Sequence, residues 1–195
     1  MHDSFTTEQK KKIITFINLA LTFNKTHNIF SRKSYNEVYE KDILDCLPLI
    51  EFLKKNDNVL DLGTGGGFPG ILLSIAKPSN QINLLEKNKK KCYFLKIVID
   101  ELKLKNTRIV NKTIAKQNTL GKFDIITARA FASIKKIINL TINNTHQNSK
   151  YILLKGKKLN IKSELRDIDI NKLRYEIIKQ EATTERNIVL KENDE

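Results

Sequence analysis

The stretch Val59-Leu-Asp-Leu-Gly-Thr-Gly-Gly-Gly-Phe-Pro-Gly70 decides the fold of this chain. It contains five of the seven glycines in the whole sequence. The apolar run at 58–62 predicts a short buried strand, and the glycines after it let the backbone turn tightly and approach a ligand closely. The helix expected next presents free backbone N–H groups. The sequence therefore predicts a ligand-binding loop between a strand and a helix, the alternative being a tight turn that binds nothing.

Strand and helix patterns alternate on both sides of this loop. Strands are predicted at 58–62, 81–86, 107–111, 123–128 and 151–155, helices at 70–76, 89–104 and 134–140, and a closing hairpin at 175–179 and 188–191. This alternation predicts an α/β fold with a parallel sheet and helices on both faces. In such a sheet the ligand lies beyond the carboxyl ends of the strands, where the strand order reverses.

The first 55 residues have a helical pattern. Thr6 and Gln9 form a capping box at the start of a helix expected to end at Phe23. Residues 24–35 are polar and predict a connection. A second helix is expected over 40–53, with a break or restart at Pro48.

The chain is strongly basic. Its 195 residues carry 35 Lys or Arg and 22 Asp or Glu, a formal net charge of +13. Residues 1–60 contribute +1, residues 61–120 contribute +7 and residues 121–195 contribute +5. This excess indicates a polyanionic partner such as nucleic acid, although compositional bias toward Lys, Asn and Ile is an equally simple reading.

Composition also excludes several classes of protein. A chain with 40% hydrophobic and 29% charged residues is globular, and two cysteines, Cys46 and Cys92, are too few for a disulfide scaffold. Its longest apolar stretches are far shorter than the roughly 20 residues of a membrane-spanning helix. The first residues lack the pattern of a signal peptide. We therefore expect a cytoplasmic protein, with no membrane partner, no metal and a monomeric state.

Two carboxylates favour S-adenosylmethionine as the ligand. Asp61 ends the first strand, where it suits the amino acid part of a ligand and would repel a pyrophosphate. Glu86 ends the next strand, where it can accept hydrogen bonds from ribose hydroxyls, a role that fits a nicotinamide cofactor equally well. No Gly-Lys-Ser/Thr follows the glycines, which excludes a P-loop.

Three motifs in this order resemble those of a known family: Gly63-Thr-Gly-Gly-Gly-Phe-Pro-Gly70, Thr127-Ala-Arg-Ala-Phe-Ala132 and Leu154-Lys-Gly156. The family is the bacterial 16S rRNA (guanine-N7)-methyltransferases, also called glucose-inhibited division protein B. Phe23-Asn-Lys-Thr-His-Asn-Ile29 and Leu44-Asp-Cys-Leu47 are similar to two further motifs of the family. The resemblance runs from about residue 23 to residue 156.

This resemblance implies a class I methyltransferase fold, Rossmann-like, with a seven-stranded and mostly parallel sheet. It implies a helical cap over 1–55 and a methyltransferase domain over 56–195. The implied reaction transfers a methyl group from S-adenosyl-L-methionine to N7 of a guanine in the decoding-region loop of 16S rRNA. The implied partner is this rRNA, either free or in the small ribosomal subunit.

Site residues follow from matching positions and from the residues themselves. The expected cofactor-binding residues are Asp61, Gly63, Gly65, Phe68, Glu86, Ile114, Ala115 and Arg129. Arg129, at the end of a predicted strand, is also the expected catalytic residue, with an ion pair to Asp61 or Asp124 as the structural alternative. The expected substrate residues are Asn24, Lys25, His27, Asn28 and Lys155; for His27 an exposed loop position is the alternative. The run Lys87, Lys89, Lys90 and Lys91 suits RNA phosphates or a solvated helix start.

Four positions depart from the family pattern. Ala115 stands where Glu is common, Asp42 where His is common, Cys46 where Ser is common, and Ala128 where Ser is common. The change at Ala115 removes a polar contact, so any contact with an adenine there must come from the backbone.

The expected reaction needs no general base, because guanine N7 already has a free lone pair. The enzyme has to hold N7 in line with the methyl sulfonium, which is catalysis by proximity and orientation. Two other readings stay open: a non-enzymatic RNA-binding protein on a methyltransferase-like fold, and a small-molecule methyltransferase or nicotinamide oxidoreductase.

Overall fold

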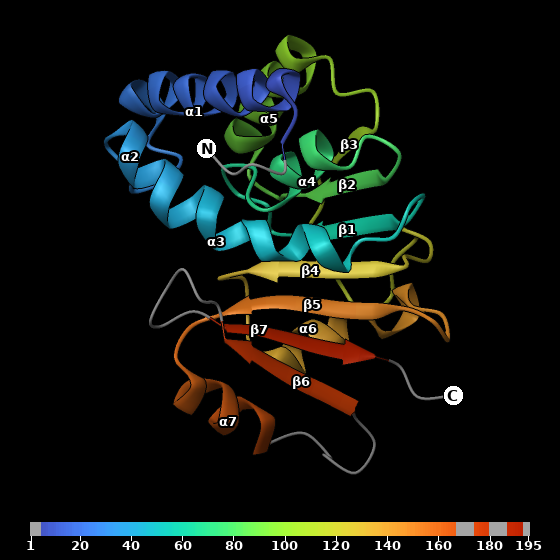
Figure 1. Cartoon of the computed structure of the whole chain (residues 1–195). Helices are drawn as coiled ribbons and strands as arrows, with labels where there is room; N and C mark the ends of the chain where they lie inside the picture. Colours follow the sequence, from blue (N-terminus) through green and yellow to red (C-terminus); the bar gives the residue numbers. More distant parts are fainter. Residues whose placement is uncertain (1–4, 167–173, 180–186, 193–195) are drawn as a thin grey trace.

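A seven-stranded sheet forms the centre of the computed structural model, which describes residues 5–166, 174–179 and 187–192 (Figure 1). The strand order is β3-β2-β1-β4-β5-β7-β6. The strands are β1 (Asn58–Leu62), β2 (Gln81–Leu85), β3 (Thr107–Val110), β4 (Ile125–Arg129), β5 (Lys150–Lys155), β6 (Arg174–Lys179) and β7 (Asn187–Glu192). The first five are parallel, and β7 lies antiparallel between β5 and β6. The expected seven-stranded, mostly parallel fold is confirmed.

The strand order reverses at β1. This strand pairs with β2 on one side and with β4 on the other, so that Leu62 lies opposite both Leu85 and Ala128. Three strands therefore end level with one another at the edge where the glycine loop begins. A topological switch point of this kind is where parallel α/β sheets bind ligands.

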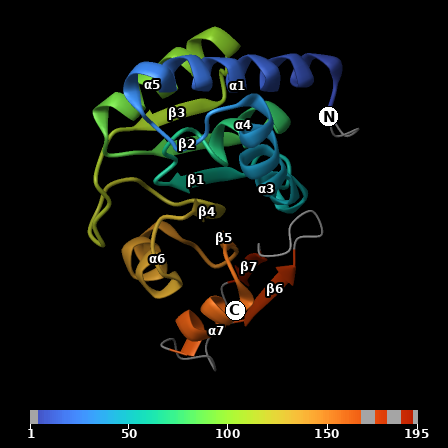
Figure 2. The same ribbon diagram turned by 90° about the vertical axis from the view of Figure 1, so that its left-hand side faces the viewer.

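Successive side chains of β1 pack into two separate cores because strand side chains alternate between faces. Val59 joins a core with residues of α1 (Thr7–His27), α4 (Gly70–Ala76) and α5 (Lys89–Leu102). Leu60 joins a core with residues of α6 (Ile134–Thr141) and α7 (Lys158–Arg166). Figure 2 shows α1 and α5 side by side, with α3 and α6 on opposite sides of β4.

Short helical segments carry the chain from α1 to β1 (Figure 1). They are α2 (Tyr35–Val38), the π-helical turn η1 (Tyr39–Ile43), α3 (Leu44–Cys46) and the 3₁₀ helix η2 (Leu47–Phe52). The predicted helix over 40–53 thus begins earlier, at Tyr35, and restarts at Leu47 beside Pro48. The predicted connection over 24–35 is wrong for its first four residues, since α1 continues to His27.

The N-terminal helix is fixed at its first turn. Thr6 and Gln9 form the predicted capping box, with 3.2 Å from the Gln9 N–H to the Thr6 hydroxyl. The Gln9 side chain also donates through Nε2 to the carbonyls of Ile75 (3.0 Å) and Ala76 (3.1 Å) at the end of α4. One residue therefore caps α1 and docks it onto the next helix.

The cap and the sheet share one core. Phe16 of α1 is fully buried, and its ring centroid lies 4.8 Å from that of Phe68 in the glycine loop. The boundary between residues 55 and 56 therefore remains a prediction. No helix among the described residues is long and apolar enough to cross a membrane.

The C-terminal part confirms the predicted hairpin, formed by β6 and β7. Helix α7 was not predicted. It is short and mostly polar and places only Ile161 and Leu165 in the core, so few apolar residues mark it as a helix.

Candidate active site

The loop after β1 needs glycine at specific positions. Gly63 has φ +66°, a left-handed conformation, and a side chain there would collide with the ring of Phe131. Gly67 has φ +96°, and a Cβ atom would lie 2.7 Å from Cγ1 of Ile71. The loop is therefore packed on both sides, against the segment after β4 and against α4.

Glu86 joins the loops that follow β1 and β2. Its Oε2 accepts the N–H of Gly65 at 3.1 Å, and its Oε1 accepts the N–H of Asn88 at 2.8 Å. The residue is 8% exposed. A carboxylate oxygen has room for two hydrogen bonds, so both Glu86 oxygens retain acceptor capacity for hydroxyl groups of a ligand.

Asp61 lies fully buried under the glycine loop. Its Oδ2 accepts the N–H of Gly70 at 2.9 Å. Its Oδ1 and Oγ1 of Thr64 have no well-aligned hydrogen bond among the described residues, although the Thr64 hydroxyl lies close enough to lower the pKa of the carboxyl. Burial raises the pKa of the Asp61 carboxyl to about 6. Buried acceptors without a well-aligned hydrogen bond are rare, so this pair fits a ligand that brings a donor, such as the ammonium group of S-adenosylmethionine.

A cleft of about 460 Å³ opens beyond the ends of β1, β2 and β4. Its walls are Gly63, Leu85, Glu86, Lys87, Lys91, Lys112, Thr113, Ile114, Ala130, Phe131, Ala132, Lys136 and Leu140. Of the predicted cofactor residues, Gly63, Glu86 and Ile114 lie on these walls. The volume and the mixture of apolar and carboxylate groups fit a nucleoside-sized ligand.

Other predicted cofactor residues lie beside this cleft. Gly65 adjoins the cleft through its hydrogen bond to Glu86, whereas Asp61 is fully buried, bonds Gly70 and is not on the cleft walls. Phe68 is buried against α1. Ala115 is exposed and is not on the walls of the cleft.

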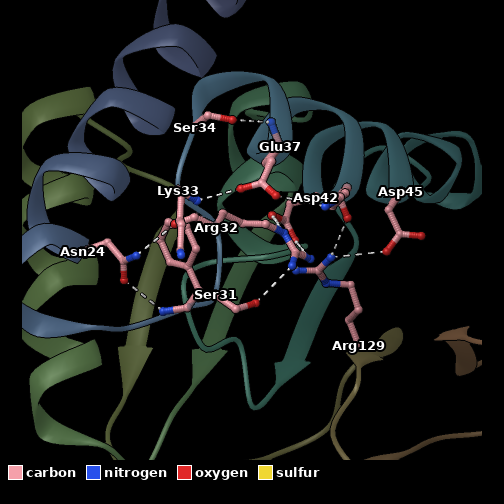
Figure 3. Close-up of polar contacts among 11 residues, drawn as sticks. Asn24, Ser31, Arg32, Lys33, Ser34, Glu37, Asp42, Asp45 and Arg129 are labelled. Atoms are coloured by element: carbon pink, nitrogen blue, oxygen red, sulfur yellow. Dashed lines mark hydrogen bonds and ion pairs between the residues drawn. The ribbon is translucent and has the colours of Figure 1, made fainter.

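Arg129 lies outside the cleft walls and points into the cap (Figure 3). Its Nη2 donates to Oδ1 of Asp42 at 2.7 Å, and its Nη1 donates to Oδ2 of Asp45 at 3.3 Å. The guanidinium carbon also lies 5.4 Å from the centroid of the Phe68 ring, a cation–π contact. The alternative partners Asp61 and Asp124 are wrong, because Asp124 contacts His146 and the cap supplies the carboxylates.

These carboxylates set the electrostatics of Arg129. Burial alone would lower the pKa of its guanidinium, but Asp42 and Asp45 outweigh burial and raise that pKa above its usual value. Arg32 approaches Asp42 from the other side, with Nε 2.9 Å from Oδ2 (Figure 3). Asp42, one of the departures from the family pattern, thus bridges two arginines.

The comparisons with known proteins decide the family. The family described as GidB, rRNA small subunit methyltransferase G, matches residues 9–189. The chain belongs to this family. The "Ribosomal RNA small subunit methyltransferase G" of Brachyspira hyodysenteriae is 35% identical over 185 residues, which cover 93% of this chain and 90% of that protein. The protein of the same name from Mycoplasma capricolum is 36% identical over 161 residues, covering 80% and 70%.

Solved structures agree on the fold of this methyltransferase G family member. A methyltransferase from Pyrococcus furiosus superposes with a TM-score of 0.66 at 15% identity, covering 97% of this chain and all (100%) of that one. A SAM-dependent methyltransferase from Aquifex aeolicus gives a TM-score of 0.63 at 17% identity, covering 80% and 92%.

The predicted substrate residues of this family member lie at two places. Lys25, His27 and Asn28 form the exposed end of α1, where the His27 ring lies 4.2 Å from that of Phe23. Asn24 accepts the N–H groups of Ile29 (2.7 Å) and Phe30 (3.1 Å) and donates to the carbonyl of Arg32, so its amide holds the loop after α1 (Figure 3).

Lys155, at the end of β5, is held in place by two acceptors. Its Nζ donates to Oε2 of Glu164 at 2.7 Å and to the carbonyl of Ala132 at 2.8 Å. It therefore fastens α7 to the segment after β4. The substrate roles of Lys155 and of the residues around the end of α1 remain predictions.

Sequence reasoning missed several residues of the site. Phe131 and Lys136 line the cleft, and Asp45 binds Arg129. Phe131 and Asp45 both fall within quoted family motifs, which was an available signal. Lys136 carried none, because one exposed lysine on a helix resembles any other. No cluster of three or more His, Cys, Asp or Glu suited to a metal occurs in the part of the chain that the structure describes.

Proposed function

We propose that this chain transfers the methyl group of S-adenosylmethionine to N7 of a guanine in the decoding-region loop of 16S rRNA. The observation that carries the proposal is membership of the methyltransferase G family over residues 9–189. The two buried carboxylates after β1 and β2 support it, because Asp61 and Glu86 suit the two ends of this cofactor. We further propose that the protein acts in the cytoplasm.

Different residues suit different parts of the cofactor. Asp61 offers a buried carboxylate to the ammonium group, and Glu86 offers two acceptors to the ribose hydroxyls. Leu85 and Ile114 provide an apolar wall for the adenine. Gly63 lines the cleft, and a side chain there would displace the ring of Phe131, which lines the same cleft.

The bound cofactor supplies a methyl group on a positively charged sulfur. Guanine N7 attacks with its own lone pair, so the chain has no proton to remove. Its task is to hold the base in line with the methyl group and to exclude water. The reaction therefore requires no general base among the side chains.

We propose that Arg129 contacts the RNA beside the reacting guanine. Arg129 directly precedes Ala130, Phe131 and Ala132, which line the cleft, and the cap carboxylates fix its guanidinium. A fixed fork of donors suits the edge of guanine or a phosphate. Its absence from the cleft walls favours the RNA over the cofactor as its ligand.

Nucleoside mass spectrometry tests the function on rRNA from a strain lacking the gene. We expect 7-methylguanosine to disappear from 16S rRNA and to return with the wild-type gene. Persistence of the modified base in the deletion strain would refute the rRNA assignment. Methylation of purified 16S rRNA and of assembled small subunits in parallel would identify the form that is bound.

Titration calorimetry with S-adenosylmethionine separates this enzyme from a non-enzymatic RNA-binding protein. Binding is expected because Asp61, Gly63 and Glu86 are all in place. Absence of binding heat across temperatures would favour the non-enzymatic alternative.

A further inference from the structure

A line of lysines leads away from the cleft over the start of α6. We call Lys112, Lys116, Lys135 and Lys136 the lysine strip. Lys112 and Lys136 line the cleft, while Lys116, Lys135 and Lys136 line a hollow of about 310 Å³. Lys136 and Leu140 belong to the walls of both, so the hollow adjoins the cleft.

Of the residues that the structure describes, one carboxylate reaches the start of α6. Oε2 of Glu164 accepts the N–H of Ile134 at 2.8 Å, and it pairs with Nζ of Lys155 at 2.7 Å rather than with the strip. The walls of the hollow contain no Asp or Glu, and the walls of the cleft contain only Glu86, which binds two backbone N–H groups. Residues 102–163 hold 14 Lys or Arg and a single acidic residue, Asp124. Asp124 accepts the N–H of Asn58 at the opposite edge of the sheet. Among the described residues, no ion pair involves an ammonium group of the strip.

This arrangement is unfavourable for the protein alone. Lys135 and Lys136 are the second and third residues after the N-cap Ser133, so two positive charges lie in the first turn of α6. The helix dipole repels cations at that end. Neighbouring lysines repel one another as well. An external polyanion would relieve both effects.

We propose that the lysine strip binds the phosphodiester backbone of RNA that continues past the target guanine, guiding it from the cleft across α6. This inference rests on the proposed function, since it extends the same RNA beyond the cleft. Ammonium groups on flexible stems bind phosphates as point charges and do not read bases. The strip therefore contributes affinity and salt dependence, whereas the choice of guanine is made elsewhere.

An acidic protein or an anionic membrane fits this surface less well. Both usually add apolar anchors to a basic patch. The hollow offers only Leu140 as a large apolar residue, and that side chain is partly buried.

The test uses the outer members of the strip, which do not line the cleft. The variant is Lys116→Gln with Lys135→Gln. The matched control is Lys103→Gln with Lys105→Gln. These two lysines are exposed and line a separate cleft beside the start of β2, at the amino ends of the strands. Both double variants remove two charges, so they differ only in where the charge is lost.

The measurement is the affinity of the full chain for a 16S rRNA fragment containing the decoding region, across a series of salt concentrations. In the strip variant we expect weaker binding and a log–log salt slope smaller by about one for each lysine removed. The KM for RNA should rise with little change in kcat, and calorimetry should give unchanged S-adenosylmethionine affinity. The control should keep the wild-type slope.

Equal salt slopes in the strip variant and the wild type would overturn the proposal. So would an equal loss in the control, because that would indicate net charge rather than a site. Loss of binding to phosphatidylserine vesicles with RNA binding intact would assign the strip to a membrane instead. RNA affinity is read without methyl transfer, so a chain that binds RNA through the strip but methylates none would refute only the proposed function.

Discussion

Arg129 at the end of β4 donates a 2.7 Å hydrogen bond to Asp42 in the cap, 87 residues earlier in the sequence. Their side chains are 15% and 4% exposed. Asp42 in turn holds Arg32, and Asp45 accepts a second hydrogen bond from Arg129. The cap is thus tied by charge to the strand end that borders the cleft.

Replacing Arg129 tests this connection. Arg129→Ala removes the cation from two buried carboxylates, and breaking such a pair costs about 3–5 kcal/mol. We expect the lower end of that range, because Asp42 keeps Arg32, together with a large loss of methyl transfer. Thermal denaturation and steady-state kinetics provide the measurements, and circular dichroism at low temperature should still show the native fold.

Glu37→Gln is the matched control. Glu37 pairs with Lys41 in the same part of the cap at 3.0 Å, but both side chains are exposed. Such solvent-exposed pairs contribute little to stability. If Arg129→Ala had the melting temperature and turnover of the control, Arg129 would neither stabilise the cap nor support methyl transfer.

The glycine loop gives a second prediction. Gly63→Val forces a β-branched residue into a left-handed conformation and against the ring of Phe131. We expect loss of S-adenosylmethionine binding in calorimetry. Gly156→Ala serves as the control, since a Cβ atom there meets nothing within 4 Å. Unchanged affinity in Gly63→Val would show that the ligand does not approach this turn.

Cofactor affinity should depend on pH through Asp61. Burial raises the pKa of this carboxyl from 3.8 to about 6, so the ligand-free protein loses the negative charge as pH falls through 6. A cationic ammonium group needs that charge. We expect the apparent Kd for S-adenosylmethionine to rise roughly ten-fold from pH 7.5 to pH 5, following the fraction of ionised carboxyl. Asp61→Asn should bind more weakly and without this pH dependence; a pH-dependent Asn variant would assign the effect to another group.

The raised pKa of Asp61 also predicts how the stability of the ligand-free protein depends on pH. Its folded pKa lies above its unfolded value, so the folded state binds more protons between 3.8 and about 6. The contribution of Asp61 to stability is therefore most favourable below 3.8 and is reduced as pH rises through 6. Urea unfolding of the wild type and of Asp61→Asn at several pH values would reveal this difference, and parallel curves would contradict it.

The core shared by cap and sheet gives the last prediction. Phe16→Ala opens a cavity beside Phe68, and a buried Phe-to-Ala change costs about 3–5 kcal/mol. We expect one cooperative transition at a lower denaturant midpoint. Ile14→Ala on the same helix, where the side chain is 40% exposed, should have a much smaller effect. Two separate transitions would instead mean that the cap unfolds independently.

Short-range patterns were enough to predict the sheet. The runs at 58–62 and 81–86 are apolar because parallel strands are covered on both faces, and turn residues bound them. The capping box at Thr6 and Gln9 located the start of α1. Helix α7 was not predicted because it is short and mostly polar, with only two core residues to indicate a helix.

The site was predictable only where one element defines it. Gly63 and Glu86 follow their strands directly, so the topology alone brings them together. The partners of Arg129 were not predictable, because Asp42 and Arg129 meet only through the packing of the cap on β4. Charge complementarity between distant segments leaves no local pattern in a sequence.

The amide of Gln9 has a consequence for how the molecule opens. It closes the first turn of α1 and also binds the last carbonyls of α4. The start of this helix therefore cannot fray while it stays docked, as free helix ends do. The N–H groups of Thr6, Gln9 and Lys10 have hydrogen-bond acceptors within this turn, so they should exchange with deuterium at the slow rate of the neighbouring core. Their exchange rates therefore report on the opening of the core.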